Sequence, residues 1–126
     1  MQGYYNIFYY ICHINNKTYK NNMNTKEYLI KCKELENEYK LKQDRLNIKY
    51  CLSNNYVNEY DIVKVNNTYF KVLSINSYIL QDYEDLVIPI LTYNAVNLNT
   101  NLIEIIYQDE ITSINNRMYN FKYKRK

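Results

Sequence analysis

The chain has 126 residues, a length suited to one domain with its own core. It contains 17 tyrosines but only one glycine, one proline and no tryptophan. A single glycine, at position 3, excludes the glycine-rich loop that binds phosphates in many nucleotide-binding proteins. Asn, Lys, Ile and Tyr make up 66 residues, and this bias toward A/T-rich codons indicates an AT-rich genome.

The net charge of +3 is distributed unevenly. Residues 1–71 carry 11 basic and 7 acidic side chains, and residues 72–116 carry six acidic and no basic ones. Residues 117–126 carry five basic and no acidic ones. We therefore expect an acidic β region followed by a basic tail, and these opposite charges can also pair between subunits.

The first stretch, residues 1–22, is aromatic and apolar up to Ile14. This apolar run is too short to span a bilayer, and the stretch lacks the basic start and the cleavage site of a signal peptide. One interpretation is a stretch that precedes the true start at Met23, and another is an exposed aromatic arm that docks on a partner. The third is an extra strand with four side chains on one face, namely Tyr5, Ile7, Tyr9 and Ile11.

A long helix is predicted at about 24–50, in a helical region bounded at 23–52. Asn24 or Thr25 can cap it, and Glu27 stands where a capping box places an acidic residue. We expect the helix either to pack along the sheet that follows or to pair with another chain. The candidate interface residues form one stripe at helical spacing: Tyr28, Cys32, Leu35, Tyr39 and Leu46.

The stretch 61–75 is predicted to be a β-hairpin. Apolar and polar residues alternate on both sides of Asn66-Asn67, and the flanks are rich in Val, Ile, Tyr and Phe. Because the chain has a single glycine, we expect asparagine to occupy the turn positions that require positive φ. Lys64 and Lys71 mark the place where a positive spot on the β region is expected.

Further strands are predicted at 86–96, 102–107 and 111–114. The polar and acidic segment 76–85 is expected to be a solvated loop, and Pro89 indicates an edge strand or a bulge. Short strands at this spacing predict a small antiparallel β-barrel or curled sheet over about 57–114, in a region bounded at 53–116. The predicted fold class is therefore α+β, with one long helix followed by the sheet.

The last stretch, residues 117–126, is basic and carries interleaved aromatic side chains. It is expected to be either a frayed, solubilising tail or an arm that contacts nucleic acid or an acidic partner. In such an arm, Lys and Arg bind phosphates while rings stack on unpaired bases. The candidate contact residues are Arg117, Tyr119, Phe121, Lys122, Tyr123, Lys124, Arg125 and Lys126.

The hairpin also carries a resemblance to a known family. Its run Tyr60-Asp61-Ile62-Val63 and the two strands that follow resemble the opening of small Src-homology-type, five-stranded β-barrels, which commonly begin Gly-Asp-x-Val. Here Tyr60 replaces that Gly. A charged helix followed by such a barrel, over residues 24–114, resembles small proteins of tailed phages and of mobile elements of low-GC bacteria. The resemblance implies binding of peptides, nucleic acids or neighbouring virion subunits.

Catalytic chemistry finds little support in the sequence. The one histidine, His13, adjoins Cys12, but the sequence shows no third residue that would complete a catalytic triad with them. The acids Asp82, Glu84 and Asp85 lack the spacing of a calcium loop. The three cysteines include no C-x-x-C pair, so we expect reduced thiols rather than disulfides or a zinc site. We expect no enzymatic activity, no cofactor and no metal.

These observations predict a non-enzymatic protein-interaction or assembly module, such as an accessory or structural protein of a phage or mobile element. The expected partners are other protein chains, including further copies of this one, with no membrane involved. The alternative is a nucleic-acid-binding module that uses the basic tail and the Lys-rich helix face (Lys26, Lys33, Lys40 and Lys49). In either case we expect the protein in the host cytoplasm or in a virion.

Overall fold

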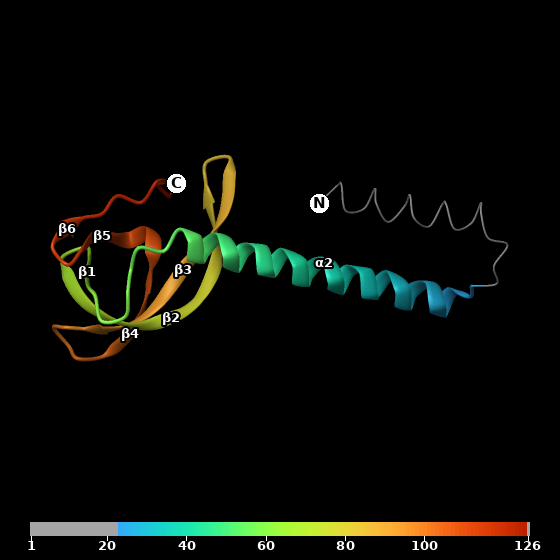
Figure 1. Ribbon diagram of the computed structural model, residues 1–126, viewed down its shortest axis with the longest axis horizontal. Coiled ribbons are helices and arrows are strands. Elements are labelled where there is room, and N and C mark those ends of the chain that lie inside the picture. Colours follow the sequence, from blue (N-terminus) through green and yellow to red (C-terminus); the bar gives the residue numbers. More distant parts are fainter. Residues whose placement is uncertain (1–22, 126) are drawn as a thin grey trace. The chain divides into compact units, whose positions relative to one another are not determined.

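The structure, a computed structural model, describes residues 23–125. The stretch 1–22, with its expected extra strand or docking arm, and Lys126 lie outside the described residues. The chain divides into two compact units, Met1–Gln43 and Asp44–Lys126. The described residues form one α-helix, α2, and a six-stranded antiparallel sheet (Figure 1), which confirms the predicted α+β fold class.

Helix α2 (Thr25–Ser53) begins at the predicted cap. The Glu27 backbone N–H donates a hydrogen bond of 2.8 Å to Asn24 Oδ1. This contact satisfies one of the amides that have no partner within the first turn of a helix. Of the two predicted capping residues, Asn24 is therefore the one used.

The other end of α2 differs from the prediction. The helix runs three residues past the predicted end at about residue 50, and it therefore includes Cys51, which is fully buried. Two side chains add hydrogen bonds to carbonyl groups in the last turn of the helix, which ends at Ser53. Ser53 Oγ donates to the Lys49 carbonyl over 2.7 Å, and Asn54 Nδ2 donates to the Tyr50 carbonyl over 2.8 Å.

Strands β1 (Ile62–Val65) and β2 (Thr68–Tyr83) form the predicted hairpin. Val65 pairs with Thr68 around the two-residue turn Asn66-Asn67. The expected use of asparagine in place of glycine is confirmed in the described chain. Four of its six residues with positive φ are asparagines, namely Asn66, Asn101, Asn115 and Asn116, and the others are Tyr60 and Glu84.

Strand β2 is longer than predicted, because it pairs with β3 (Leu86–Asn97) as far as Tyr83. The segment 76–85 is therefore mostly strand, and only its last two residues form a turn. The apolar start of β3 supplies the ladder partners of this polar segment. We call residues 78–91 the arm. Pro89 lies in the arm beyond the stretch of β3 that β4 pairs, which agrees with the predicted edge position.

The remaining elements are β4 (Ile103–Tyr107), the 3₁₀ turn η1 (Gln108–Glu110), β5 (Ile111–Ile114) and β6 (Arg117–Met118). The strand order is β4-β3-β2-β1-β5-β6. The sheet curls strongly (Figure 1) but is not closed, so a closed barrel is wrong and a curled sheet is confirmed. Within residues 23–125 no ladder joins β4 to the two-residue strand β6, so these two strands are the edges of the described sheet.

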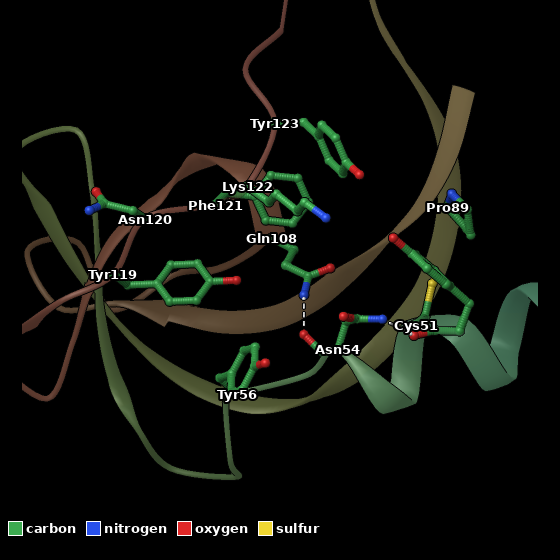
Figure 2. Close-up of a pocket in the computed structure, with 11 residues that line it drawn as sticks. Cys51, Asn54, Tyr56, Pro89, Gln108, Tyr119, Asn120, Phe121, Lys122 and Tyr123 are labelled. Atoms are coloured by element: carbon green, nitrogen blue, oxygen red, sulfur yellow. Dashed lines mark hydrogen bonds between the residues drawn. The ribbon is translucent and has the colours of Figure 1, made fainter. Parts of the chain in front are cut away.

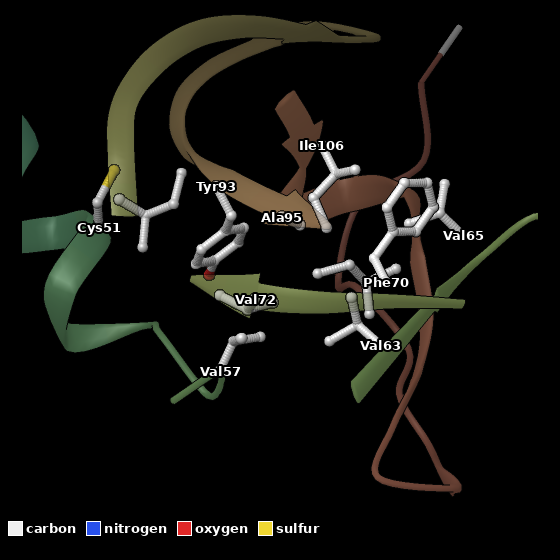
Figure 3. Close-up of a cluster of buried hydrophobic side chains, with 11 residues drawn as sticks. Cys51, Val57, Val63, Val65, Phe70, Val72, Tyr93, Ala95 and Ile106 are labelled. Carbon is white, nitrogen blue, oxygen red and sulfur yellow. The ribbon is translucent and has the colours of Figure 1, made fainter. Parts of the chain in front are cut away.

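Two clusters of buried side chains hold the sheet together. The main cluster fills the inside of the curl (Figure 3) and consists of Cys51, Val57, Val63, Val65, Phe70, Val72, Leu91, Tyr93, Ala95, Ile106 and Ile111. The second cluster lies on the arm and consists of Tyr83, Ile88 and Ile90. The arm therefore has a small core of its own, which requires a cover from elsewhere in the chain.

Candidate binding surfaces

The C-terminal segment 117–125 supplies that cover and is not frayed. It begins as β6 beside β5, and Tyr119 packs against the main cluster. Phe121 and Tyr123 pack against the second cluster, with ring centroids 5.9 and 5.7 Å from that of Tyr83. The aromatic side chains predicted to stack on bases are thus half-buried against the chain itself.

Arg125 ties the end of this segment to Asp109. Its Nε and Nη2 donate to the two carboxylate oxygens over 2.5 and 2.7 Å, and the Tyr83 hydroxyl donates to Oδ2 over 2.7 Å. These bonds satisfy a carboxylate whose side chain is 2% exposed. Burial, and then the bond to Asp109, raise the pKa of Tyr83. The acidic region and the basic tail, considered for pairing between subunits, are here joined within one chain.

An aromatic pocket of about 220 Å³ lies between the end of α2, Pro89 and the C-terminal segment (Figure 2). Gln108, fully buried, anchors one wall. Its Nε2 donates to the Asn54 carbonyl over 3.0 Å, and its Oε1 accepts the Leu91 N–H over 3.0 Å. The rings that line the pocket are Tyr50, Tyr56, Tyr119, Phe121 and Tyr123.

Two titratable side chains that line this pocket have raised pKa values. Burial raises the pKa of the Cys51 thiol to about 11, so it carries little thiolate at neutral pH. Burial likewise raises the pKa of Tyr119. The volume is below the roughly 300–1,000 Å³ of typical small-molecule sites. The pocket can accept one ring or a short apolar side chain.

A larger apolar groove of about 560 Å³ lies between the last turns of α2 and the arm. We call it the helix–arm groove. Its exposed apolar side chains are Ile48 and Leu52 from α2 and Ile75 and Leu80 from β2. A neighbouring hollow of about 510 Å³ shares Ile48 and Leu52 and extends the apolar surface along the helix.

One end of the helix–arm groove is fixed by Tyr78. Its hydroxyl donates a hydrogen bond to Asp44 and accepts one of 3.4 Å from Asn47 Nδ2. The bond to Asp44 raises the pKa of Tyr78, because an ionised phenol would repel the carboxylate. The last turns of α2 are thereby attached to β2 by polar contacts while the apolar side chains remain accessible.

The predicted helix stripe does not form this groove. Leu46 is 60% exposed and does not line it. Tyr28, Leu35 and Tyr39 are also exposed, and Cys32 is half-buried. The sequence prediction missed Ile48 and Leu52. Their i,i+4 spacing could have indicated that both side chains lie on one face of the helix. Leu52 was not considered for that face, because the helix was expected to end at about residue 50.

The basic side chains of the predicted arm have different environments. Arg117, Lys122 and Lys124 are exposed, Arg125 is paired, and Lys126 lies outside the described residues. On the hairpin, the Lys64 ammonium lies 5.6 Å from the centre of the Tyr69 ring, and that of Lys71 lies 5.3 Å from the Tyr60 ring. The basic groups are therefore dispersed over several elements.

Within residues 23–125, no three His, Cys, Asp or Glu side chains gather where they could hold a metal ion. Of the acids considered in the sequence, Asp82 lies in β2, and Glu84 and Asp85 form the turn after it. The same part of the chain has no helix with the length and apolar character needed to cross a bilayer. The chain matches no family model, no curated protein and no solved structure.

Proposed function

We propose that this protein is a non-enzymatic interaction module that binds an apolar segment of another protein chain in the helix–arm groove. The observation that carries the proposal is the group of four accessible aliphatic side chains, Ile48, Leu52, Ile75 and Leu80, on one concave surface. Complete burial of one such side chain stabilises a complex by about 1.5–3 kcal/mol. Concave apolar surfaces of this kind commonly mark protein-binding sites.

The groove favours a short amphipathic helix as its occupant. Ile48 and Leu52 lie one helical turn apart and present a ridge, against which apolar side chains at i and i+3 or i+4 can pack. Arg45 and Lys49 line the neighbouring hollow, so an acidic flank on the partner segment would be favoured. The proposed partner segment is therefore apolar on one face and acidic at its border.

A role in a phage or mobile element is the finer part of this proposal. The strand order β4-β3-β2-β1-β5, in which the fifth strand returns beside the first, supports the resemblance to small five-stranded barrels. The free thiols of Cys32 and Cys51 support a reducing compartment such as the host cytoplasm. In this role the protein would assemble with other chains of the same particle or element.

Photocrosslinking tests the groove directly. A benzoylphenylalanine placed at Leu52 should capture the partner in the cells that encode the protein, whereas the same group at Leu46, which is also exposed on the helix, should not. Leu52→Asp should then weaken binding of the captured partner by more than about tenfold, and Leu46→Asp should leave it unchanged. Equal capture from both positions would show that the partner does not bind specifically in the helix–arm groove.

A nucleic-acid-binding function is the second candidate, and the exposed Arg117, Lys122 and Lys124 favour it. Because the nearby rings are half-buried, such binding would depend on phosphate contacts and would be strongly salt-dependent. Removal of the whole segment would uncover the second cluster, so charge-neutral variants are the better test. Arg117→Gln with Lys124→Gln should weaken a low-salt gel shift, and an unchanged shift would reject this use of the segment.

A further inference from the structure

Among residues 23–125, strand β4 is an edge of the sheet with no protecting feature. Natural sheets protect their edges with short strands, prolines, lysines or bulges. The opposite edge follows this rule, because β6 has two residues and one of them is Arg117. Pro89 and Asp82 similarly protect the two sides of the arm. Strand β4 has five residues with no proline and no basic side chain, and its one carboxylate, on Glu104, accepts a hydrogen bond of 2.7 Å from Asn97 Nδ2 of its own chain.

The hydrogen-bond phase shows which backbone groups of β4 face outward. The Asn97 N–H donates to the Leu102 carbonyl over 2.8 Å, so the backbone of Leu102 faces Asn97 of β3. In an antiparallel ladder every second residue faces the partner strand. Glu104 and Ile106 therefore face β3. The N–H and C=O groups of Ile103 and Ile105 point away from the sheet, where no described strand pairs with them.

Apolar side chains accompany these open backbone groups. Ile103 is 66% exposed and Ile105 is 53% exposed, and Leu102, just before the strand, is exposed as well. Ile103 and Ile105 share one face of the sheet because they are two residues apart. An arriving strand would thus gain main-chain hydrogen bonds and bury two isoleucines, which is the combination that β-augmentation uses.

We propose that the occupant of this edge is β4 of a second copy of the chain, paired antiparallel about a two-fold axis at Ile105. In this register Ile105 faces Ile105 of the second copy, and Glu104 faces the second copy's Ile106. The neighbouring register, centred on Glu104, would place two carboxylates opposite each other, which is unfavourable. The Ile105-centred pairing avoids this contact, and in it the two curled sheets become one continuous sheet.

This dimer uses a surface separate from the helix–arm groove, so the two proposals can fail independently. Light scattering after size exclusion of the full chain should give twice the 15.4 kDa mass at high concentration, with dissociation on dilution. Ile105→Lys should weaken the dimer by on the order of tenfold or more, because two lysines would face each other at the axis. The matched control is Met118→Lys on the β6 edge, which should dimerise like the wild type.

A cysteine pair tests the register. Residues that exchange both hydrogen bonds in an antiparallel ladder have Cα atoms about 5.5 Å apart, which suits a disulfide. Under mild oxidation, Ile105→Cys should form a covalent dimer above the background of the wild-type chain, whereas Ile103→Cys should not. A wild-type monomer at every concentration, an Ile105→Lys dimer as tight as the wild type, or equal crosslinking from position 103 would overturn the proposal. So would a dimer lost with Leu52→Asp but not with Ile105→Lys.

Discussion

Tyr93, fully buried in the main cluster, donates a hydrogen bond of 2.7 Å to Asn55 Oδ1 in the connector after α2. The same oxygen accepts the Val57 N–H over 3.0 Å, and Asn55 Nδ2 donates to the Val57 carbonyl over 3.0 Å. One core tyrosine therefore positions the chain between the helix and the sheet. This contact is the most direct polar link between the main cluster and the connector.

Replacement of Tyr93 by Phe should lower the free energy of unfolding by about 0.5–1.5 kcal/mol, the usual net value of one hydrogen bond. Asn55 keeps its bonds to Val57, so the loss should not be larger. Urea denaturation followed by circular dichroism measures it. The control is Tyr69→Phe, at a ring that is 40% exposed, where we expect a change within about 0.5 kcal/mol. Equal effects at the two positions would argue against a structural role for the bond.

Arg125→Gln should destabilise the chain by about 1–3 kcal/mol, because the Asp109 carboxylate would lose two charge-assisted bonds while remaining buried. The partial exposure of Arg125 places the expected value in this range rather than higher. Chemical denaturation at neutral pH gives the difference. Lys124→Gln removes an exposed charge from the adjacent residue and should have almost no effect. A loss caused equally by both variants would indicate a general charge effect instead.

Asn66→Ala should cost about 1 kcal/mol, because Asn66 has a φ of 55° and asparagine tolerates the left-handed region better than alanine does. Asn66→Gly should be neutral or stabilising. Asn67, the other turn residue, is not among the positive-φ residues, so Asn67→Ala should change stability much less. Thermal unfolding of the three variants compares them. The assignment of the strained position would be wrong if Asn67→Ala were the more damaging change.

Stability should fall at alkaline pH. Burial raises the pKa of Cys51 from 9.0 to about 11, and it also raises the pKa values of Tyr83 and Tyr93. Below about pH 9, both states of the chain hold these protons and the contribution to stability is complete. As the pH rises further, the unfolded chain releases protons that the folded chain retains, so the free energy of unfolding decreases.

Cys51→Ala isolates the contribution of the thiol. The variant is expected to be less stable at neutral pH, because a buried side chain is shortened, but its loss between about pH 9 and 11 should be smaller than that of the wild type. Urea midpoints across this range provide the comparison. Parallel declines in the two proteins would show that the thiol contributes nothing to the pH dependence.

Local patterns in the sequence predicted the hairpin and the helix cap well. Val63 and Val65 lie on either side of the polar Lys64, and both are buried as the alternation requires. The Asn24 side chain caps the helix by accepting a hydrogen bond from Glu27, only three residues further along the chain. Such features depend on contacts between residues close in the chain, and for this reason the sequence alone reveals them.

The arm and the C-terminal segment could not be predicted in this way. Residues 76–83 are largely polar, as suits a two-stranded ribbon with much of its surface in water. Their own pattern does not predict a strand, because their strand structure depends on pairing with β3. The partners of Phe121 and Tyr123 lie about 30 residues or more earlier in the chain, and composition alone does not indicate such contacts. The charge pattern placed Asp109 and Arg125 in regions of opposite sign but did not identify their pairing.

The position of Phe121 and Tyr123 in the chain has a consequence for synthesis. The arm can form its backbone ladder as soon as β3 has emerged from the ribosome, but its second cluster acquires its aromatic cover only after the last described residues are made. Until then Tyr83, Ile88 and Ile90 are open to water and to other nascent chains. Translation therefore leaves an interval in which the uncovered arm can misassemble with other chains.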